Sequence, residues 1–216
     1  MAKFGLITEG ITDQIVIENI LCGFYKDYED LDEDISAIEP PRDETDKQQG
    51  HSEFGTGWSA IFSYLSEKRF RDDVDNSEHV IIQIDTDIAE DFNCSINQNQ
   101  TIEEIIECTM QKMIEKIDEK EIFYEENKGK IIFAISIHSL ECWILPIYSQ
   151  KNEVIHKCFD KLNIEVPKVS KKLKVNKTYN DYDKLSRIFV KHKELMKIKS
   201  KNSSFEIFID NLPKEI

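Results

Sequence analysis

The chain has 216 residues, of which 40% are hydrophobic and 10% aromatic, so it can bury the core of an α/β domain and is not wholly disordered. Its 42 acidic and 28 basic residues give a formal charge of −14, which argues against nucleic-acid binding over the whole surface. The beginning of the chain does not resemble a signal peptide, and no apolar run approaches the roughly 20 residues that span a bilayer. The five scattered cysteines, without a C-x-x-C pair, favour reduced thiols. We therefore expect a cytoplasmic protein with no membrane partner.

The hydrophobic pattern predicts strands that alternate with helices. The β-branched run at 79–84 is the clearest strand, and apolar residues recur at helical spacing between Ile105 and Ile117. In chain order we expect a strand at 3–8, a helix at 12–25, a strand at 35–39, a long polar loop at 42–57, a helix at 58–69, a strand at 79–84, a helix at 101–120, a strand at 130–137 and a helix at 140–148.

This alternation predicts an α/β fold with a mostly parallel central sheet flanked by helices. The composition changes after Gln150, where Lys-rich, helical-looking segments without strand signals follow. We therefore expect an α/β domain over residues 1–150 and a helical, basic C-terminal appendage over residues 151–216.

Acidic residues follow three of the predicted strands. Glu9 comes after the first strand, Asp85 and Asp87 after the third, and Glu141 after the fourth. Taken singly, Glu9 is more often a turn residue and Glu141 a first-turn acid, and a D-x-D pair is as often a loop start or helix cap as a site. The carboxyl ends of parallel strands share one edge, however, where ligands bind. Alternate residues of an extended segment share a face, so a divalent cation would relieve the repulsion between Asp85 and Asp87. Ligation by oxygen alone favours Mg²⁺ or Mn²⁺ over zinc.

The order of these motifs resembles the TOPRIM domain of topoisomerases, primases, OLD nucleases and small stand-alone proteins of bacterial phage defence. The resemblance covers roughly residues 3–148, and its motifs are Thr8-Glu9-Gly10-x-Thr12-Asp13 and Asp85-x-Asp87. It implies a TOPRIM-like fold, acid/base chemistry or metal binding by Glu9, and Mg²⁺ ligation by the two aspartates.

Two further segments resemble the small stand-alone members of that family. They are His138-Ser-Leu-Glu141-Cys-Trp143-Ile-Leu145 and Asn202-Ser-Ser-Phe205-x-x-Phe208. Glu141 is accordingly a further candidate catalytic residue. Asp91 is either an additional metal ligand or an exposed acid, and the lack of a glycine close after Asp87 departs from the family's pattern.

Basic residues are concentrated between Lys168 and Lys201, where twelve of them accompany only three acidic residues. This asymmetry fits a surface that holds a phosphate backbone beside an acidic centre, and the alternative is a solvated segment that pairs with the acidic half of the chain. Lysine binds phosphate as a point charge, so little base readout is implied. The candidate nucleic-acid-binding residues are Lys172, Lys184, Arg187 and Lys191. Among them, Lys184 is the candidate for a lysine near the scissile phosphate. Arg42 and His51, on the long loop, are either within reach of the site or simply exposed.

These residues predict a nuclease that uses Mg²⁺ or Mn²⁺ to cleave DNA or RNA, transfer RNA included. The resemblance implies a toxin-like effector of anti-phage abortive infection that works beside an ATPase on another chain, because no Gly-x-x-x-x-Gly-Lys loop is present. The main alternative is a non-catalytic acidic module that binds a partner protein. A haloacid-dehalogenase-type phosphatase is disfavoured, because its nucleophilic aspartate follows the first core strand. A homodimer stays an open alternative, since the apolar residues of 101–120 fit a core or an interface.

Overall fold

The computed structural model describes residues 2–42, 57–87, 100–150 and 155–216. Within them, four parallel strands form one sheet in the order β2-β1-β3-β4. The strands are β1 (Ala2–Ile7), β2 (Ile35–Glu39), β3 (Ser77–Asp85) and β4 (Ile131–Ser136). Ile7 lies opposite Ile82 and Asp85 opposite Ser136, so β1, β3 and β4 end at one edge of the sheet. The predicted strands and the flanked parallel sheet are confirmed.

Helices connect the strands and continue to the end of the chain. They are α1 (Ile11–Phe24), α3 (Trp58–Leu65), α4 (Lys68–Asp75), α5 (Ile102–Ile117), α6 (Tyr124–Asn127), α7 (Glu141–Tyr148), α8 (Cys158–Val169), α9 (Tyr179–Ser186), α10 (His192–Lys199) and α11 (Ser203–Asn211), with 3₁₀ turns η1 (Leu31–Asp34) and η3 (Arg187–Val190).

The single helix expected at 58–69 is wrong, because two helices occupy this region. Glu67 between them has an extended backbone (φ −85°, ψ 154°), and the hydroxyl of Ser66 donates to the carbonyl of Ser63 at 2.9 Å. A serine side chain that bonds the local backbone competes with the helix ladder, which accounts for the break. Most of the loop expected at 42–57 lies outside the described residues.

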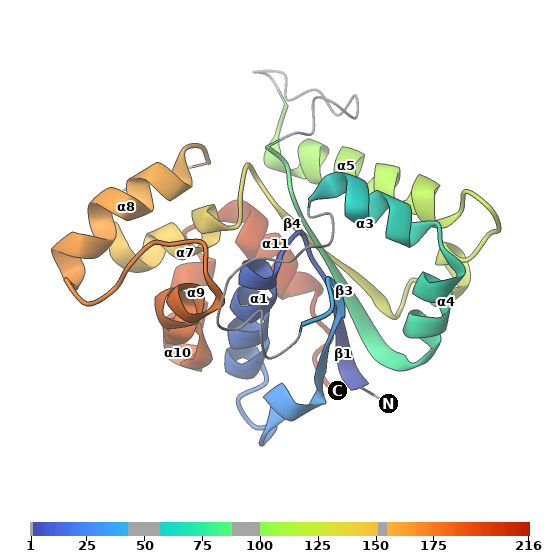
Figure 1. The fold of residues 1–216 in the computed structure, drawn as a ribbon, viewed down its shortest axis with the longest axis horizontal. Helices are drawn as coiled ribbons and strands as arrows, with labels where there is room; N and C mark the ends of the chain where they lie inside the picture. The colour runs from blue at the N-terminus through green and yellow to red at the C-terminus, as the bar shows by residue number, and fades with distance from the viewer. Residues whose placement is uncertain (1, 43–56, 88–99, 151–154) are drawn as a thin grey trace.

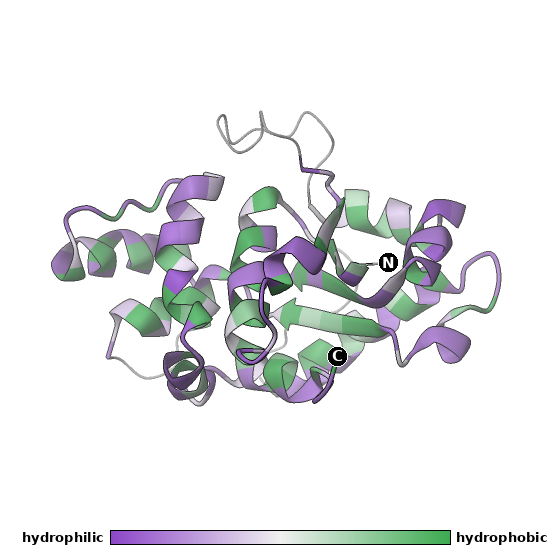
Figure 2. Ribbon diagram, turned by 90° about the horizontal axis from the view of Figure 1, so that it is seen from below, coloured by the Kyte–Doolittle hydropathy of each residue, from purple (hydrophilic) through white to green (hydrophobic). Residues whose placement is uncertain are grey.

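Helices cover both faces of the sheet (Figure 1). On one face, α3, α4 and α5 pack with Ile7 and Ile82. On the other, α1 and α11 belong to the cluster of Phe4 and Ile81, α9 and α10 pack on α1, and α8 packs on α7. Successive strand residues point to opposite faces, so a strand buried on both sides needs a continuous apolar run. The strands are accordingly mostly hydrophobic, whereas the helices carry both kinds of residue (Figure 2).

The C-terminal helices share the core of β1 and α1. Phe189, Phe205 and Phe208 are buried in the same hydrophobic cluster as Phe4. The contact is close at Gly23 of α1, where an added Cβ would lie 1.8 Å from the carbonyl oxygen of Phe189. A side chain does not fit there, so α1 and η3 can approach only because position 23 is glycine. The helical character of the appendage is confirmed, and a domain boundary at residue 150 stays a prediction.

The segments 138–145 and 202–208 meet in this core. The ring of Trp143 lies 5.2 Å from that of Phe205 and 5.3 Å from that of Phe208, and its Nε1 donates to Ser204 Oγ at 2.8 Å. Asn202 caps α11 by accepting from the amide of Phe205 at 2.9 Å. This packing sets the position of α7, which begins at the carboxyl edge of the sheet.

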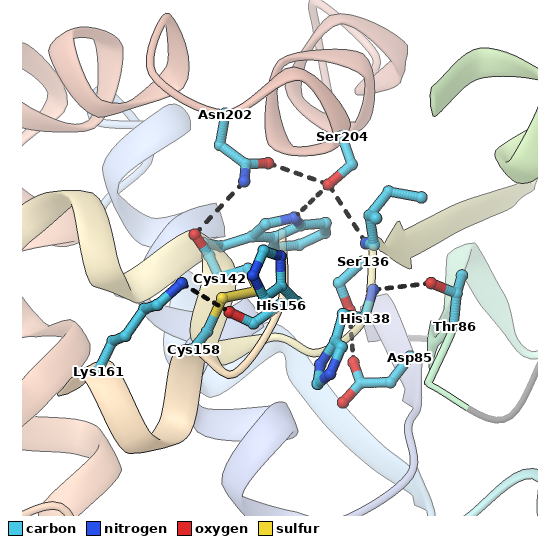
Figure 3. Close-up of a disulfide and its surroundings, with 12 residues drawn as sticks. Asp85, Thr86, Ser136, His138, Cys142, His156, Cys158, Lys161, Asn202 and Ser204 are labelled. Atoms are coloured by element: carbon cyan, nitrogen blue, oxygen red, sulfur yellow. Dashed lines mark hydrogen bonds between the residues drawn. A yellow bond between two sulfur atoms is a disulfide. The ribbon is translucent and has the colours of Figure 1, made fainter. Parts of the chain in front are cut away.

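Cys142 at the start of α7 and Cys158 at the start of α8 form a disulfide (Figure 3). The expectation of reduced thiols is therefore wrong for this pair, and the cysteines no longer support a reducing compartment. The packing of α7 on α8 brings the two Cα atoms to 5.1 Å, a proximity that a separation of 16 residues does not reveal. Among the described helices, none is long and apolar enough to cross a membrane.

Candidate functional site

A polar cleft of about 290 Å³ opens at the carboxyl edge of the sheet. Residues from the ends of β1 and β3, the first turns of α1 and α7, and the segment before α9 converge on it. Its lining consists of Glu9, Gly10, Ile11, Thr12, Asp13, Gly57, Asp85, Asp87, Glu141 and Lys177. The structure thus brings together the four carboxylates that the sequence pointed to, as expected for parallel strands that end at one edge.

Glu9 follows β1 and is held by the end of β3. Its Oε1 accepts a hydrogen bond from the backbone amide of Asp85 at 2.5 Å. Its own amide donates to Oε1 of the fully buried Gln83 at 3.3 Å. Gly57 lies beside it, and an added Cβ there would stand 3.8 Å from Glu9 Oε2. The carboxylate of Glu9 is therefore fixed against the backbone of the D-x-D segment.

Asp85 is oriented by two neutral donors. Oδ1 accepts from Gln83 Nε2 at 2.9 Å and also from Ser136 Oγ (Figure 3). Both donors bond Oδ1, so Oδ2 of Asp85 takes part in neither of these two hydrogen bonds. Asp87, two residues on, is exposed at the opening of the cleft.

Thr86, between the two aspartates, is fully buried and joins β3 to β4. Its amide donates to the carbonyl of Ser136 at 3.0 Å, and its Oγ1 accepts from the amide of His138 at 2.7 Å. His138 has a left-handed backbone with φ of 67°, which is uncommon outside glycine. The central residue of the D-x-D motif thus sets the path of the chain from β4 into α7.

Glu141, the first residue of α7, is only 5% exposed and makes contacts with the C-terminal segment. Its Oε1 accepts from the hydroxyl of Tyr182 in α9 and lies 3.7 Å from the ammonium of Lys177. The lysine that lines the cleft is therefore Lys177, whereas Lys184, the residue expected nearest the scissile phosphate, is not part of the lining. Lys184 lies on the exposed side of α9, because the helical period turns it away when Tyr182 faces the core.

Asp13 is a fifth carboxylate of the cleft that the sequence reasoning did not select. It stands in the first turn of α1. The signal was present in Thr8-Glu9-Gly10-x-Thr12-Asp13, since a helix that starts right after a parallel strand begins at the sheet's carboxyl edge. An acid in a first helical turn is common for reasons of capping and dipole alone, which is why its spacing did not single it out.

Burial and neighbouring carboxylates raise the pKa values of three acidic residues of the cleft, Glu9, Asp13 and Asp85. Burial, followed by the charge of Asp85, raises the pKa of Glu9 to about 8. Burial also raises the pKa of Asp85 and of Asp13 well above the usual range, with neighbouring carboxylates adding to the effect in each case. Lys177 lowers the pKa of Glu9 and of Asp13, but less than burial raises them. The single lysine therefore does not offset the effect of burial and neighbouring carboxylates, and the metal-free cleft favours the protonated forms of these acids.

The other candidate residues lie elsewhere. Lys172, Lys184, Arg187 and Lys191 are exposed and none lines the cleft; within the described residues Arg187 pairs with Asp183 at 3.2 Å. Arg42 does not reach the site, because Glu18 binds its guanidinium at 3.0 Å and Tyr179 at 3.1 Å. Asp91 and His51 lie outside the described residues.

In the part of the chain that the structure describes, no three His, Cys, Asp or Glu side chains stand close enough to form a ready-made metal site. No protein-family model, curated protein or solved structure matches this chain. The class that the fold and the site define is thus an α/β protein with a carboxylate-lined cleft at the carboxyl edge of a parallel sheet.

Proposed function

We propose that this chain is a TOPRIM-type phosphodiesterase that depends on Mg²⁺ or Mn²⁺ and cleaves nucleic acid. The observation that carries the proposal is the convergence of Glu9, Asp13, Asp85, Asp87 and Glu141 on one cleft at the carboxyl edge of the sheet. Burial and neighbouring carboxylates raise the pKa values of Glu9, Asp13 and Asp85, so a bound cation would favour their ionised forms, and hard oxygen ligands suit Mg²⁺ and Mn²⁺.

A Mg²⁺ ion does not require a complete cage of protein ligands. It usually keeps several waters and binds one or two carboxylates together with substrate phosphate oxygens. The absence of a three-residue cluster among the described residues is compatible with such a site. Asp85 and Asp87 would hold the ion, with Glu9, Asp13 and Glu141 as the other carboxylates of the cleft. A bound ion would polarise a phosphate oxygen and make a bound water more acidic.

The protein's own groups would then position the substrate and move a proton. Glu9, whose pKa is raised to about 8 in the metal-free cleft, is the carboxyl group proposed as general acid or base. The ammonium of Lys177 would contact a phosphate oxygen. The N-terminus of α1, which begins at Ile11 in the cleft, offers backbone N–H groups and a favourable dipole to the same anion.

Nucleic acid is the proposed substrate because exposed basic residues continue from Lys177 along the C-terminal segment. Lys172 and Lys174 precede it, and Lys184 and Lys191 follow, all exposed. Such residues would track a phosphate backbone without reading bases, so either DNA or RNA fits. The resemblance to defence-associated TOPRIM proteins favours an anti-phage effector with an ATPase partner.

The test is cleavage of plasmid DNA and of total transfer RNA by the purified protein with Mg²⁺, Mn²⁺ or EDTA. Glu9→Ala and the double variant Asp85→Ala/Asp87→Ala are compared with the unchanged protein. Metal-dependent cleavage that both variants abolish would support the proposal. Equal cleavage by all three proteins would remove these residues from the active site.

A second candidate is a non-catalytic module whose acidic cleft binds a basic partner. It is favoured by the lack of a ready-made metal cluster among the described residues. Calorimetric titration with Mn²⁺ separates the two functions. Binding that Asp85→Ala weakens supports the enzyme, whereas no binding by the unchanged protein supports the module.

A further inference from the structure

The disulfide adjoins Glu141 of the acidic cleft on one side and, on the other, Phe159, whose ring contacts a second cleft residue, Lys177. Cys142 follows Glu141 in the chain, and Cys158 precedes Phe159. The ammonium of Lys177 lies 5.4 Å from the centre of the Phe159 ring and 3.7 Å from Oε1 of Glu141. Glu141 and Phe159 are therefore connected in two ways. One is covalent, through the Cys142–Cys158 disulfide, and the other is through Lys177, whose ammonium contacts both side chains.

Lys177 needs such support to stay in place. It lies in the segment between α8 and α9, and its side chain is 67% exposed. A single ion pair in contact with water holds a long side chain only weakly. The face of an aromatic ring adds a second attraction for the ammonium, provided that the ring itself is held. Phe159, in the first turn of α8, is only partly buried.

The disulfide is the covalent anchor of that first turn. Cys142 is 1% and Cys158 0% exposed, Phe159 packs against the core with a partly buried side chain, and Leu162 and Val166 are buried one and two turns further on. Cys142 itself is held by the core, because its carbonyl accepts from Asn202 Nδ2 at 3.4 Å. The beginning of α8 is thus tied to the same turn that carries Glu141.

We propose that the Cys142–Cys158 disulfide positions Lys177 against Glu141 by holding Phe159. These residues act through Lys177 and are positioning residues. A dithiol reductant would deliver two electrons and two protons to the sulfur pair, giving two cysteine thiols and the oxidised reductant, and would release Lys177 from the cleft. The consequence for catalysis rests on the proposed function, whereas the positioning of Lys177 does not.

The experiment measures how fast each lysine of the intact protein reacts with an amine-acylating reagent, with peptide mapping by mass spectrometry. The map of the unreduced protein should show a peptide pair joined through Cys142 and Cys158. After reduction, and in the variant Cys142→Ala/Cys158→Ala, the reaction rate of Lys177 should rise about two- to fivefold, as expected for loss of an exposed ion pair. Lys172 and Lys174, in the same segment, serve as internal controls and should not change. Free thiols at both cysteines, or an unchanged rate at Lys177, would overturn the proposal.

Phe159→Leu provides a second test that keeps the disulfide and removes only the ring. This substitution should raise the acylation rate of Lys177 by about as much as reduction does. The test does not depend on whether the double cysteine variant folds. In cleavage assays, Lys177→Ala should lower activity in the oxidised protein and have little further effect after reduction, because dependent sites are not additive. If reduction and Lys177→Ala lowered the cleavage activity additively, the disulfide would not act on cleavage through Lys177. If the reactivity of Lys177 changes as expected but no protein cleaves nucleic acid, the proposed function is overturned and the positioning role of the disulfide stands.

Discussion

The hydroxyl of Tyr182 donates a hydrogen bond to Oε1 of Glu141, and both side chains are buried. The bond joins α9, in the Lys-rich part of the chain, to the first residue of α7 at the carboxyl edge of the sheet. Burial, followed by the charge of Glu141, raises the pKa of Tyr182 far above its usual value, so the phenol stays a donor at neutral pH. The C-terminal segment thus helps to build the cleft.

Tyr182→Phe should lower the free energy of unfolding by about 2–3 kcal/mol, because a buried carboxylate loses a hydrogen bond. Urea denaturation measures this change. Tyr28→Phe is the matched control, since its hydroxyl donates to Asp34 at 2.8 Å in a more exposed place and its loss should cost less than about 1 kcal/mol. Equal effects of the two substitutions would contradict a special role for the buried bond.

The metal-free protein should lose stability as the pH rises from about 4.5 to 8. Burial, and then the charge of Asp85, raises the pKa of Glu9 to about 8, so the folded protein keeps a proton that the unfolded chain has released. The free energy of unfolding therefore falls with pH across this interval, because the native state binds more protons.

Glu9→Gln should stabilise the metal-free protein by about 1–3 kcal/mol at pH 8 and change it little at pH 4.5. The glutamine oxygen can still accept from the amide of Asp85. Urea denaturation in EDTA at the two pH values gives the comparison, with Glu107→Gln on the exposed side of α5 as the control. A stabilisation that is independent of pH would show that the carboxylate of Glu9 ionises normally.

Gln83→Leu should weaken Mn²⁺ binding by about 10- to 100-fold if Asp85 is a ligand, because residues that orient a ligand contribute that much to affinity. Gln83 is fully buried, and its side chain donates to Asp85 Oδ1 at 2.9 Å. Isothermal titration calorimetry measures the affinity. Gln111→Leu, at an exposed position of α5, should leave the affinity unchanged; an equal loss there would point to a nonspecific effect.

Ser204→Ala should lower the free energy of unfolding by about 1–3 kcal/mol, because the buried Nε1 of Trp143 loses its acceptor. Thermal or urea unfolding measures the change. Ser200→Ala, whose exposed hydroxyl donates to the carbonyl of Lys197 at 3.1 Å, should have a much smaller effect. Binding of Mn²⁺ should be the same in both variants, so a loss in Ser204→Ala would mean that this core bond also shapes the cleft.

Local patterns were a good guide wherever one short segment decides the outcome. The β-branched run at 79–84 forms β3, and the apolar repeat from Ile105 to Ile117 forms α5. Glu9, Asp85 and Glu141 follow parallel strands, so a rule about strand ends placed them at one edge. Hydrophobic spacing did not predict that the helix expected at 58–69 is interrupted at Ser66. The interruption depends on a hydrogen bond from the Ser66 hydroxyl to the backbone, which the spacing of apolar residues does not reveal.

The sequence by itself thus determined the α/β class, the strands and the carboxylate edge, because these follow from hydrophobic period and chain direction. Only the tertiary structure decided that Asp13 and Lys177 complete the cleft, that Tyr182 holds Glu141, and that Cys142 bonds to Cys158. Each of these contacts depends on how α7, α8 and α9 pack on one another and on α1. That packing is the summed result of many weak apolar contacts between distant segments, and no single stretch of the chain encodes it.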